Sequence, residues 1–244
     1  MQERERRLLE VLGDGRFHSG EELARALGVS RAAVWKHLNS LGRRGLEVHA
    51  VRGRGYRLPN PLELLDPEGI RAQLSPSVQG RLAQLEVFDQ IDSTNSYLLT
   101  RAKAGAPGGS VCLAERQSAG RGRRGRQWIS PFAANLYLSV LWRYPDGPAL
   151  LSGLSLAVGV AMARALEGVG VVGVGLKWPN DLLWRDQKLG GILLEFGGES
   201  SGPCQVVTGV GLNVTMPKEP ALDIDQPWPD LTTVLGLGLS RNRL

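Results

Sequence analysis

Residues 120–128 read GRGRRGRQW, a stretch that holds four arginines and three glycines in nine residues. It has no apolar face to bury, so we expect a mobile loop. Glycine lets backbone N–H groups approach a ligand closely, and each guanidinium matches phosphate or carboxylate oxygens in a bidentate geometry. The stretch therefore predicts an anion-binding loop, and the alternatives are a solvated basic loop or an RNA-binding tail.

The composition around this loop is that of a folded protein. Of the 244 residues, 42% are hydrophobic and 22% are charged, which is typical of one or two globular domains. The net charge of +5 arises within the first 60 residues, which hold 12 Lys and Arg against 7 Asp and Glu, whereas the remaining residues balance at 17 and 17. A positive excess confined to one end is expected of a nucleic-acid-binding module.

Cysteine usage and apolar runs bound the class of protein further. Cys112 and Cys204 lie in strand-like runs without CxxC or Cys/His spacing, so we expect free buried thiols and no metal site. The first residues, MQERERR, lack the apolar core of a signal peptide. The apolar run at residues 150–163 is too short for a bilayer and predicts a buried core helix. We therefore expect a cytoplasmic protein without a membrane segment.

Residues 1–60 carry the pattern of a winged helix-turn-helix. Ser19 and Glu22 form a capping box before one helix, and Ser30 can cap the next. That second helix has an apolar stripe at Val34, Leu38 and Leu41. Two short strands follow at residues 47–51 and 56–58, joined by a basic tip. The residues predicted to contact DNA are Ser30, Arg31, Lys36, Asn39, Arg52 and Arg54.

The alternative for this unit is a small helical adaptor whose charges are only solvated, which the basic hairpin tip disfavours. The Leu-Pro-Asn-Pro stretch at residues 58–61 breaks every regular pattern, so we place the domain boundary after residue 60. Beyond it, several apolar strand-like runs alternate with a few helical ones. They predict an α+β fold, with a mixed, mostly antiparallel sheet and helices packed on one face.

Three further motifs lie in this second region: residues 177–181 (KWPND), 188–195 (KLGGILLE) and 209–214 (GVGLNV). Together with the glycine-arginine stretch and the winged-helix pattern, they resemble the biotin–protein ligases of the bifunctional ligase/repressor type over nearly the whole chain. The resemblance implies that residues 61–244 form a catalytic domain similar to class II aminoacyl-tRNA synthetases. Members of this family continue into an SH3-like barrel, whereas this sequence stops at residue 244, so we expect a truncated terminus.

The resemblance also implies a reaction. The carboxylate of biotin attacks the α-phosphorus of ATP, which yields biotinyl-5'-AMP, and the biotinyl group then passes to a lysine of biotin carboxyl carrier protein. Mg²⁺ is expected with the ATP phosphates, although no carboxylate is a clear ligand, and Asp181 is more readily read as a turn residue. The implied partners are the carrier protein, operator DNA and a second copy of the chain in a ligand-promoted homodimer.

Site residues follow from the same resemblance. Lys177 is the first catalytic candidate and Arg123 the second, while Ser93, Thr94 and Asn95 would hold the ureido head of biotin. A plain helix N-cap is the alternative for these three residues. The other predicted ligand contacts are Gln117, Arg121, Gly122, Trp128 against adenine, Gly190, Gly191 and Asn213; a packing role is the alternative for the last two glycines.

Two other functions stay open at the level of the sequence. One is a biotin-responsive repressor with weak or no ligase activity, which the missing tail favours. The other is a lipoate-type ligase, which shares the fold and the acyl-adenylate chemistry but is disfavoured by the winged helix and the arginine-rich loop.

Overall fold

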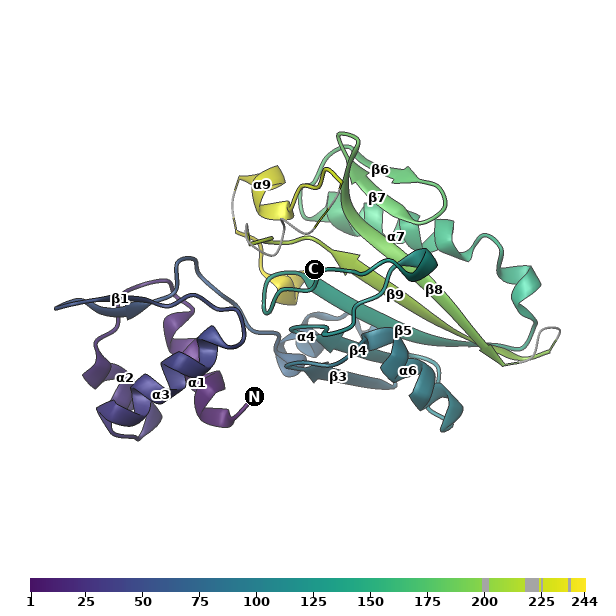
Figure 1. The fold of residues 1–244 in the computed structure, drawn as a ribbon. Coiled ribbons are helices and arrows are strands. Elements are labelled where there is room, and N and C mark those ends of the chain that lie inside the picture. Colours follow the sequence, from purple (N-terminus) through teal and green to yellow (C-terminus); the bar gives the residue numbers. More distant parts are fainter. Residues whose placement is uncertain (199–201, 218–223, 225, 237) are drawn as a thin grey trace. The chain divides into compact units, whose positions relative to one another are not determined.

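The computed structural model describes residues 1–198, 202–217, 224, 226–236 and 238–244. The chain forms two compact units, Met1–Leu64 and Leu65–Leu244 (Figure 1). The division falls later than the boundary placed after residue 60. Residues just past that boundary join the first unit because the Leu62 N–H donates to the Gly13 carbonyl at 2.9 Å.

The first unit contains three helices, α1 (Glu3–Leu12), α2 (Gly20–Leu27) and α3 (Arg31–Gly42), and an antiparallel hairpin of β1 (His49–Val51) and β2 (Gly55–Arg57). The predicted caps are confirmed: the Glu22 N–H donates to Ser19 Oγ at 3.1 Å, and the Ala33 N–H to Ser30 Oγ at 3.3 Å. The predicted stripe on α3 is also confirmed, because all three of its side chains are buried: Val34, Leu38 and Leu41.

The second unit is built on a seven-stranded sheet with the order β3-β4-β5-β9-β8-β7-β6. Its strands are β3 (Gln84–Phe88), β4 (Ser110–Ala114), β5 (Leu136–Tyr144), β6 (Val174–Lys177), β7 (Asp181–Trp184), β8 (Gln187–Gly198) and β9 (Cys204–Leu212). The β3–β4 pair is parallel and the other five pairs are antiparallel, so the predicted mixed, mostly antiparallel sheet is confirmed.

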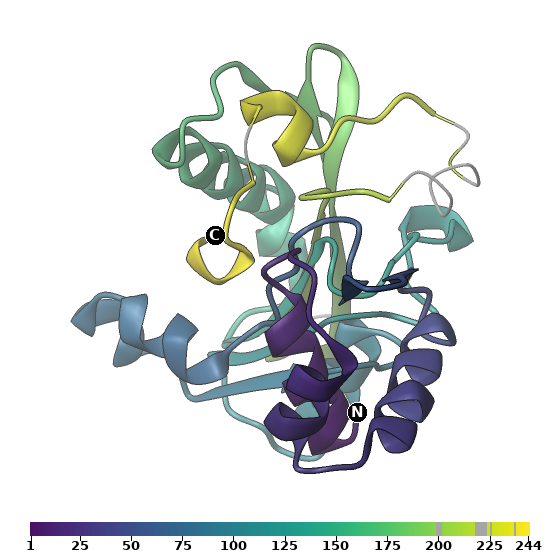
Figure 2. The same ribbon diagram turned by 90° about the vertical axis from the view of Figure 1, so that its left-hand side faces the viewer.

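Helices cover both faces of this sheet, so the prediction of helices on one face is wrong. On one face, α6 (Thr94–Lys103) packs against Cys112, Leu141 and Val207. On the other face, Leu113, Leu136 and Leu212 pack against α7 (Leu154–Gly168), α4 (Pro67–Gln73) and α9 (Leu231–Leu235) (Figures 1 and 2). Side chains alternate between the faces of a strand, and here both sets are apolar.

The long apolar run does not form a fully buried helix. A short turn, η2 (Pro148–Leu151), comes first, and α7 begins only at Leu154. Within α7 the buried residues are Gly159 and Leu166, whereas Leu156 and Val160 are 45% and 42% exposed. No helix among the described residues is long and apolar enough to cross a bilayer.

The strand that leads to Gln117 is shorter than predicted, since β4 ends at Ala114. The next side chain, Glu115, turns inward and forms a buried ion pair with Arg241 at 2.7 Å. Arg241 belongs to η3 (Arg241–Arg243), and it also donates to the Asn135 carbonyl at 3.2 Å. The two cysteines are free and buried, as predicted. The remaining short elements are α5 (Pro76–Gln79) and η1 (Arg123–Gly125).

Candidate functional site

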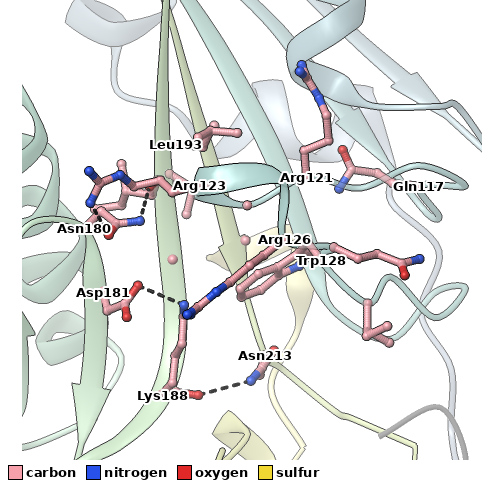
Figure 3. Close-up of a pocket in the computed structure, with 18 of the residues that line it drawn as sticks. Gln117, Arg121, Arg123, Arg126, Trp128, Asn180, Asp181, Lys188, Leu193 and Asn213 are labelled. Carbon is pink, nitrogen blue, oxygen red and sulfur yellow. Dashed lines mark hydrogen bonds and ion pairs between the residues drawn. The ribbon is translucent and has the colours of Figure 1, made fainter. Parts of the chain in front are cut away.

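A cleft of about 770 Å³ opens in the second unit, between the start of α6, the 120–128 loop, the turn after β6, and strands β8 and β9 (Figure 3). It brings together most of the predicted ligand contacts: Ser93, Thr94, Asn95, Gln117, Arg121, Gly122, Arg123, Trp128, Lys177, Gly191 and Asn213. Residues from four separate motifs therefore line one cleft.

The start of α6 supplies a buried polar cluster. Ser93 is the helix N-cap, as its alternative interpretation predicted, and accepts from the Ser96 N–H at 3.4 Å. Thr94 donates to Gln117 Oε1 through both its backbone N–H, at 2.9 Å, and its hydroxyl, at 3.1 Å. Asn95 Nδ2 donates to Glu195 Oε2 at 2.8 Å. Thr94 and Asn95 thus do more than cap a helix, because their side chains bond to groups from other elements.

The arginine-rich loop has backbone structure of its own, which its composition did not indicate. The Trp128 N–H donates to the Gly120 carbonyl at 2.9 Å, and the Gly122 N–H to the Arg126 carbonyl at 2.7 Å. Arg124 takes a left-handed conformation, with φ 58°. These bonds close the loop into a hairpin, so the arginine side chains project from an ordered backbone.

Two arginines of the loop are directed to different parts of the cleft. Arg121 donates to Glu195 Oε2 at 2.8 Å and to Ser96 Oγ at 3.0 Å. Arg123 donates to Asn180 Oδ1 at 3.4 Å, and Figure 3 shows its side chain extending toward Asn180, apart from Arg121. Positive charge is therefore distributed along the cleft rather than gathered at one point.

Trp128 lies flat against the sheet where two glycines leave room for its ring. A Cβ atom on Gly211 would collide with the indole, and one on Gly191 would lie 3.3 Å from Cζ3. Trp128 Nε1 is buried and has no hydrogen-bond partner among the described residues. A buried donor without a partner is costly, and this N–H lies against the sheet at Gly211.

Gly190 does not line the cleft. A Cβ atom there would lie 2.8 Å from the Gly211 carbonyl oxygen and 3.1 Å from Leu182 Cδ1, so this position has the packing role that was its alternative interpretation. Gly191 behaves differently because successive strand residues point to opposite faces, which places it beside Trp128.

The cleft is also lined by a second lysine, Lys188, which was not among the predicted site residues. Lys188 Nζ lies 2.9 Å from Asp181 Oδ1, and the lysine side chain is only 18% exposed. Its ammonium is 5.8 Å from the centroid of the Trp128 ring. Lys177 also lines the cleft but is exposed. Lys188 is the first residue of the KLGGILLE motif, but only the two glycines of that motif were predicted to contact the ligand.

The remaining predicted contact, Asn213, is buried and joins three segments. Its Nδ2 donates to the Lys188 carbonyl at 3.4 Å and to the Pro229 carbonyl at 3.2 Å. No group of three or more His, Cys, Asp or Glu side chains within the described ranges is placed to hold a metal ion. Asp181, the one carboxylate weighed as a magnesium ligand, is paired with Lys188.

The first unit presents a basic, exposed surface on α3 and on the β1–β2 hairpin. The residues predicted to contact DNA are all exposed there: Ser30, Arg31, Lys36, Asn39, Arg52 and Arg54. The Arg54 guanidinium stacks 4.3 Å from the centroid of the Phe17 ring, which fixes one side of the hairpin tip. Trp35, on α3, is 60% exposed. This arrangement has the parts of a DNA-binding interface, a helix and a wing.

Comparison with known families matches residues 87–213 to the biotin/lipoate A/B protein ligase family and residues 4–57 to an HTH domain. The chain is 48% identical to the bifunctional ligase/repressor BirA of Salmonella typhimurium, over 97% of this chain and 72% of that protein. Identity to BirA of Escherichia coli is 47%, over 98% of this chain and 72% of that protein.

Among solved structures, the biotin protein ligase from Aquifex aeolicus in complex with biotin and ATP is similar, with a TM-score of 0.53 and 30% identity. The match covers 65% of this chain and 64% of that one. The matched family region contains most of the residues that line the cleft, and the matched HTH region runs from the first turn of α1 to the end of β2. The chain therefore belongs to the biotin/lipoate A/B protein ligase family, among its bifunctional ligase/repressor members.

Proposed function

We propose that the protein is an ATP-dependent biotin–protein ligase that also represses transcription, with biotinyl-5'-AMP as corepressor. The observation that carries the proposal is the pairing, in one cleft, of a neutral polar cluster with a row of cations. Thr94, Asn95 and Gln117 form the cluster, and Lys188 and the loop arginines form the row. Biotin has a neutral ureido head, which suits the polar cluster, and an anionic carboxylate, which suits the cations.

The neutral cluster suits the ureido ring. That ring has one carbonyl acceptor and two N–H donors, so a tight site must offer both donors and acceptors. Apolar side chains lie next to the cluster in the same cleft, at Leu138, Leu193 and Val210, and they suit the alkyl chain of biotin. The carboxylate at the end of that chain then lies toward the cations.

The cationic part of the cleft answers the main difficulty of the first half-reaction, which brings a carboxylate and a phosphate together. Lys188 is the better-shielded cation, and we assign it to the carboxylate and the α-phosphate. Lys177 ends β6 and lines the same cleft with an exposed side chain, and we assign it to the outer phosphates. A fixed positive charge in a site that excludes water stabilises the developing anionic transition state more than one in bulk water does.

The loop arginines and Trp128 would hold the nucleotide. Arg121 and Arg123 can exchange their present partners for phosphate oxygens. For Arg123 the exchange replaces a long bond of 3.4 Å to a neutral amide oxygen with an ion pair to phosphate, which is stronger. Trp128 would stack on adenine and Asn213 would contact the adenylate. The loop would then cover the mixed anhydride and keep water from it until the acceptor lysine of the carrier protein arrives.

Mg²⁺ would enter with ATP. Since Asp181 is engaged by Lys188, we expect the ion to be held chiefly by phosphate oxygens and water, as Mg²⁺ commonly is. Its chemistry there would be to neutralise charge on the phosphates.

The repressor function rests on the first unit together with a dimer. One winged helix reads only a short half-site, so specific binding requires two copies at a fixed spacing. We propose a homodimer promoted by the adenylate and formed at an edge of the sheet.

The test of the ligase function is biotin-dependent ATP–pyrophosphate exchange, which needs no protein partner. We expect exchange with biotin and none with lipoate. Exchange with lipoate alone would assign the lipoate-type activity, which the description of the family also covers. Tight biotin binding by calorimetry without exchange would leave a biotin-responsive repressor.

A further inference from the structure

Beneath the polar cluster, three neighbouring strands form a row that receives the Asn95 side chain. Ser139 on β5 and Leu193 on β8 both pair with Gly209 on β9. A Cβ atom on Gly209 would collide with the Asn95 amide, so glycine is required for the side chain to reach the sheet. Asn95 therefore rests on backbone, between Ser139 on one side and Leu193 on the other.

The orientation of the Asn95 amide is fixed by acceptors on one side. Its Nδ2 donates to Glu195 Oε2 at 2.8 Å and to the Leu193 carbonyl at 3.3 Å. Both of these groups only accept, so the reversed amide would place oxygen against oxygen. The Oδ1 atom must consequently face Ser139, whose Oγ lies 2.6 Å away and donates to it.

Ser139 connects this amide to Thr94. Its side chain is fully buried, and its Oγ is also within 2.7 Å of Thr94 Oγ1. A hydroxyl carries one proton, and Asn95 Oδ1 needs it because that atom only accepts. The Thr94 hydroxyl must then supply the proton of the 2.7 Å bond to Ser139 Oγ, because two lone pairs would otherwise face each other, and Gln117 Oε1 is its longer second acceptor at 3.1 Å. Thr94 is left with lone pairs, and no proton, for a ligand.

We propose that Ser139 and Glu195 are positioning residues that fix the hydrogen-bond polarity of this subsite, so that the Thr94 hydroxyl accepts an N–H from the ligand. This inference rests on the proposed biotin site. Neither residue needs to touch the ligand. Glu195 sets the Asn95 amide, Asn95 draws the Ser139 proton, and Thr94 is kept as an acceptor. The subsite thereby selects a ring N–H over an oxygen at the same position.

The experiment compares two probes by calorimetry: biotin, and its cyclic carbamate analogue in which a ring oxygen replaces one ureido N–H. The full-length chain should bind biotin at least about tenfold more tightly than the better-matched carbamate isomer, because an unmade bond to a buried acceptor costs on the order of 1–3 kcal/mol. In Ser139→Ala this ratio should fall by about fivefold, since the Thr94 hydroxyl loses its 2.7 Å acceptor and can turn its proton toward the ligand.

Thr208→Val is the matched control. Thr208 is the neighbouring residue on β9, it is buried, and its hydroxyl has no hydrogen-bond partner within the described residues. Removing that hydroxyl should leave the ratio unchanged. Should Ser139→Ala fail to fold, Glu195→Gln tests the same point, because a glutamine amide can present a donor to Asn95, reverse its amide and lower the ratio.

The outcomes separate the inference from the function on which it rests. A native chain that does not bind biotin contradicts the proposed function. A native chain that binds biotin, with Ser139→Ala weakening both probes equally, leaves the function intact and overturns the inference, because a purely structural role lowers both affinities without changing their ratio. An equal fall of the ratio in Thr208→Val also overturns it.

Discussion

Lys188 and Asp181 form an ion pair of 2.9 Å between neighbouring strands of the cleft, and the Lys188 ammonium lies 5.8 Å from the centre of the Trp128 ring. The carboxylate and the aromatic face together hold this lysine in one direction. An incoming carboxylate or phosphate can replace Asp181 as partner without moving the strand. The ion pair therefore holds the Lys188 ammonium in an orientation that suits an anionic ligand.

Replacing this cation should abolish most of the first half-reaction. We expect Lys188→Ala to lower biotin-dependent ATP–pyrophosphate exchange by at least about a hundredfold, the usual scale for losing one preorganised charge donor. Lys177→Ala should cost less, about tenfold, because solvent screens its exposed ammonium. Exchange by Lys188→Ala within threefold of the native rate would remove its assigned role, and a larger loss in Lys177→Ala would restore the sequence-based choice.

Arg123 should control how long the adenylate stays bound. Arg123→Ala removes a guanidinium that can leave Asn180 for a phosphate oxygen, so biotinyl-5'-AMP should dissociate at least about fivefold faster, as expected from losing one charge-assisted bond. Stopped-flow dissociation measures this rate. Arg185→Ala is the control, since Arg185 is an exposed arginine that stacks on Trp184 and does not line the cleft. Equal lifetimes in the two variants would argue against a lid.

Short-range patterns predicted the parts of the fold that depend on neighbours in the chain. The Ser19–Glu22 capping box and the Val34 stripe of α3 were readable because each lies within one or two helical turns. The motifs likewise located most of the cleft. The helix caps and the apolar stripe depend on residues close together in the chain, so their pattern can be read from a single sequence.

The sequence could not show which features meet across the sheet. Glu115 follows the end of β4, and its side chain pairs with Arg241, far along the chain. Gly190 and Gly191 are adjacent and chemically identical, yet the register of β8 directs one to packing and the other to the cleft. Ser139 carries no motif, and its place beside Asn95 follows from strand order alone. Such roles depend on register and order, which residue spacing does not fix.

His18 should make the first unit more stable at mildly acidic pH. Its Nε2 lies 2.9 Å from Asp14 Oδ1 and its Nδ1 3.2 Å from Glu22 Oε1. Burial lowers the pKa of His18, but the hydrogen bonds and charges of the two carboxylates outweigh it and raise the pKa above its ordinary value. The added stability is complete below the unfolded-state pKa of about 6.5 and is lost as pH rises through the folded-state pKa.

Amide hydrogen exchange in α2 of the full chain checks this dependence. Protection should be greater at pH 6 than at pH 8 after correction for the intrinsic exchange rate. In His18→Gln the difference should disappear, because glutamine keeps a polar side chain but does not titrate. A native chain with the same corrected protection at both values would contradict the assignment.

The adenylate should also bring two copies of the chain together. Strand β8 continues past its final pairing with β7 at Gly191, and across the described part of the chain no strand covers that side of residues 194–198. Phe196 in this segment is 45% exposed. An open strand edge can pair with the same edge of a second copy. The balanced charge of residues 61–244 adds no net repulsion between copies.

Dimerisation should couple the cleft to DNA binding. If the coupling free energy is about 1–3 kcal/mol, biotinyl-5'-AMP should tighten specific DNA binding by roughly 5- to 150-fold at matched salt. Phe196→Lys places a charge on the open edge, so this variant should stay monomeric with ligand and lose the coupling. Its biotin-dependent exchange should stay near the native rate, because Phe196 does not line the cleft. Sedimentation and DNA titration with and without the adenylate measure both effects. Identical monomer fractions and identical DNA affinities in the native chain, with and without ligand, would show that the cleft does not regulate the winged helix.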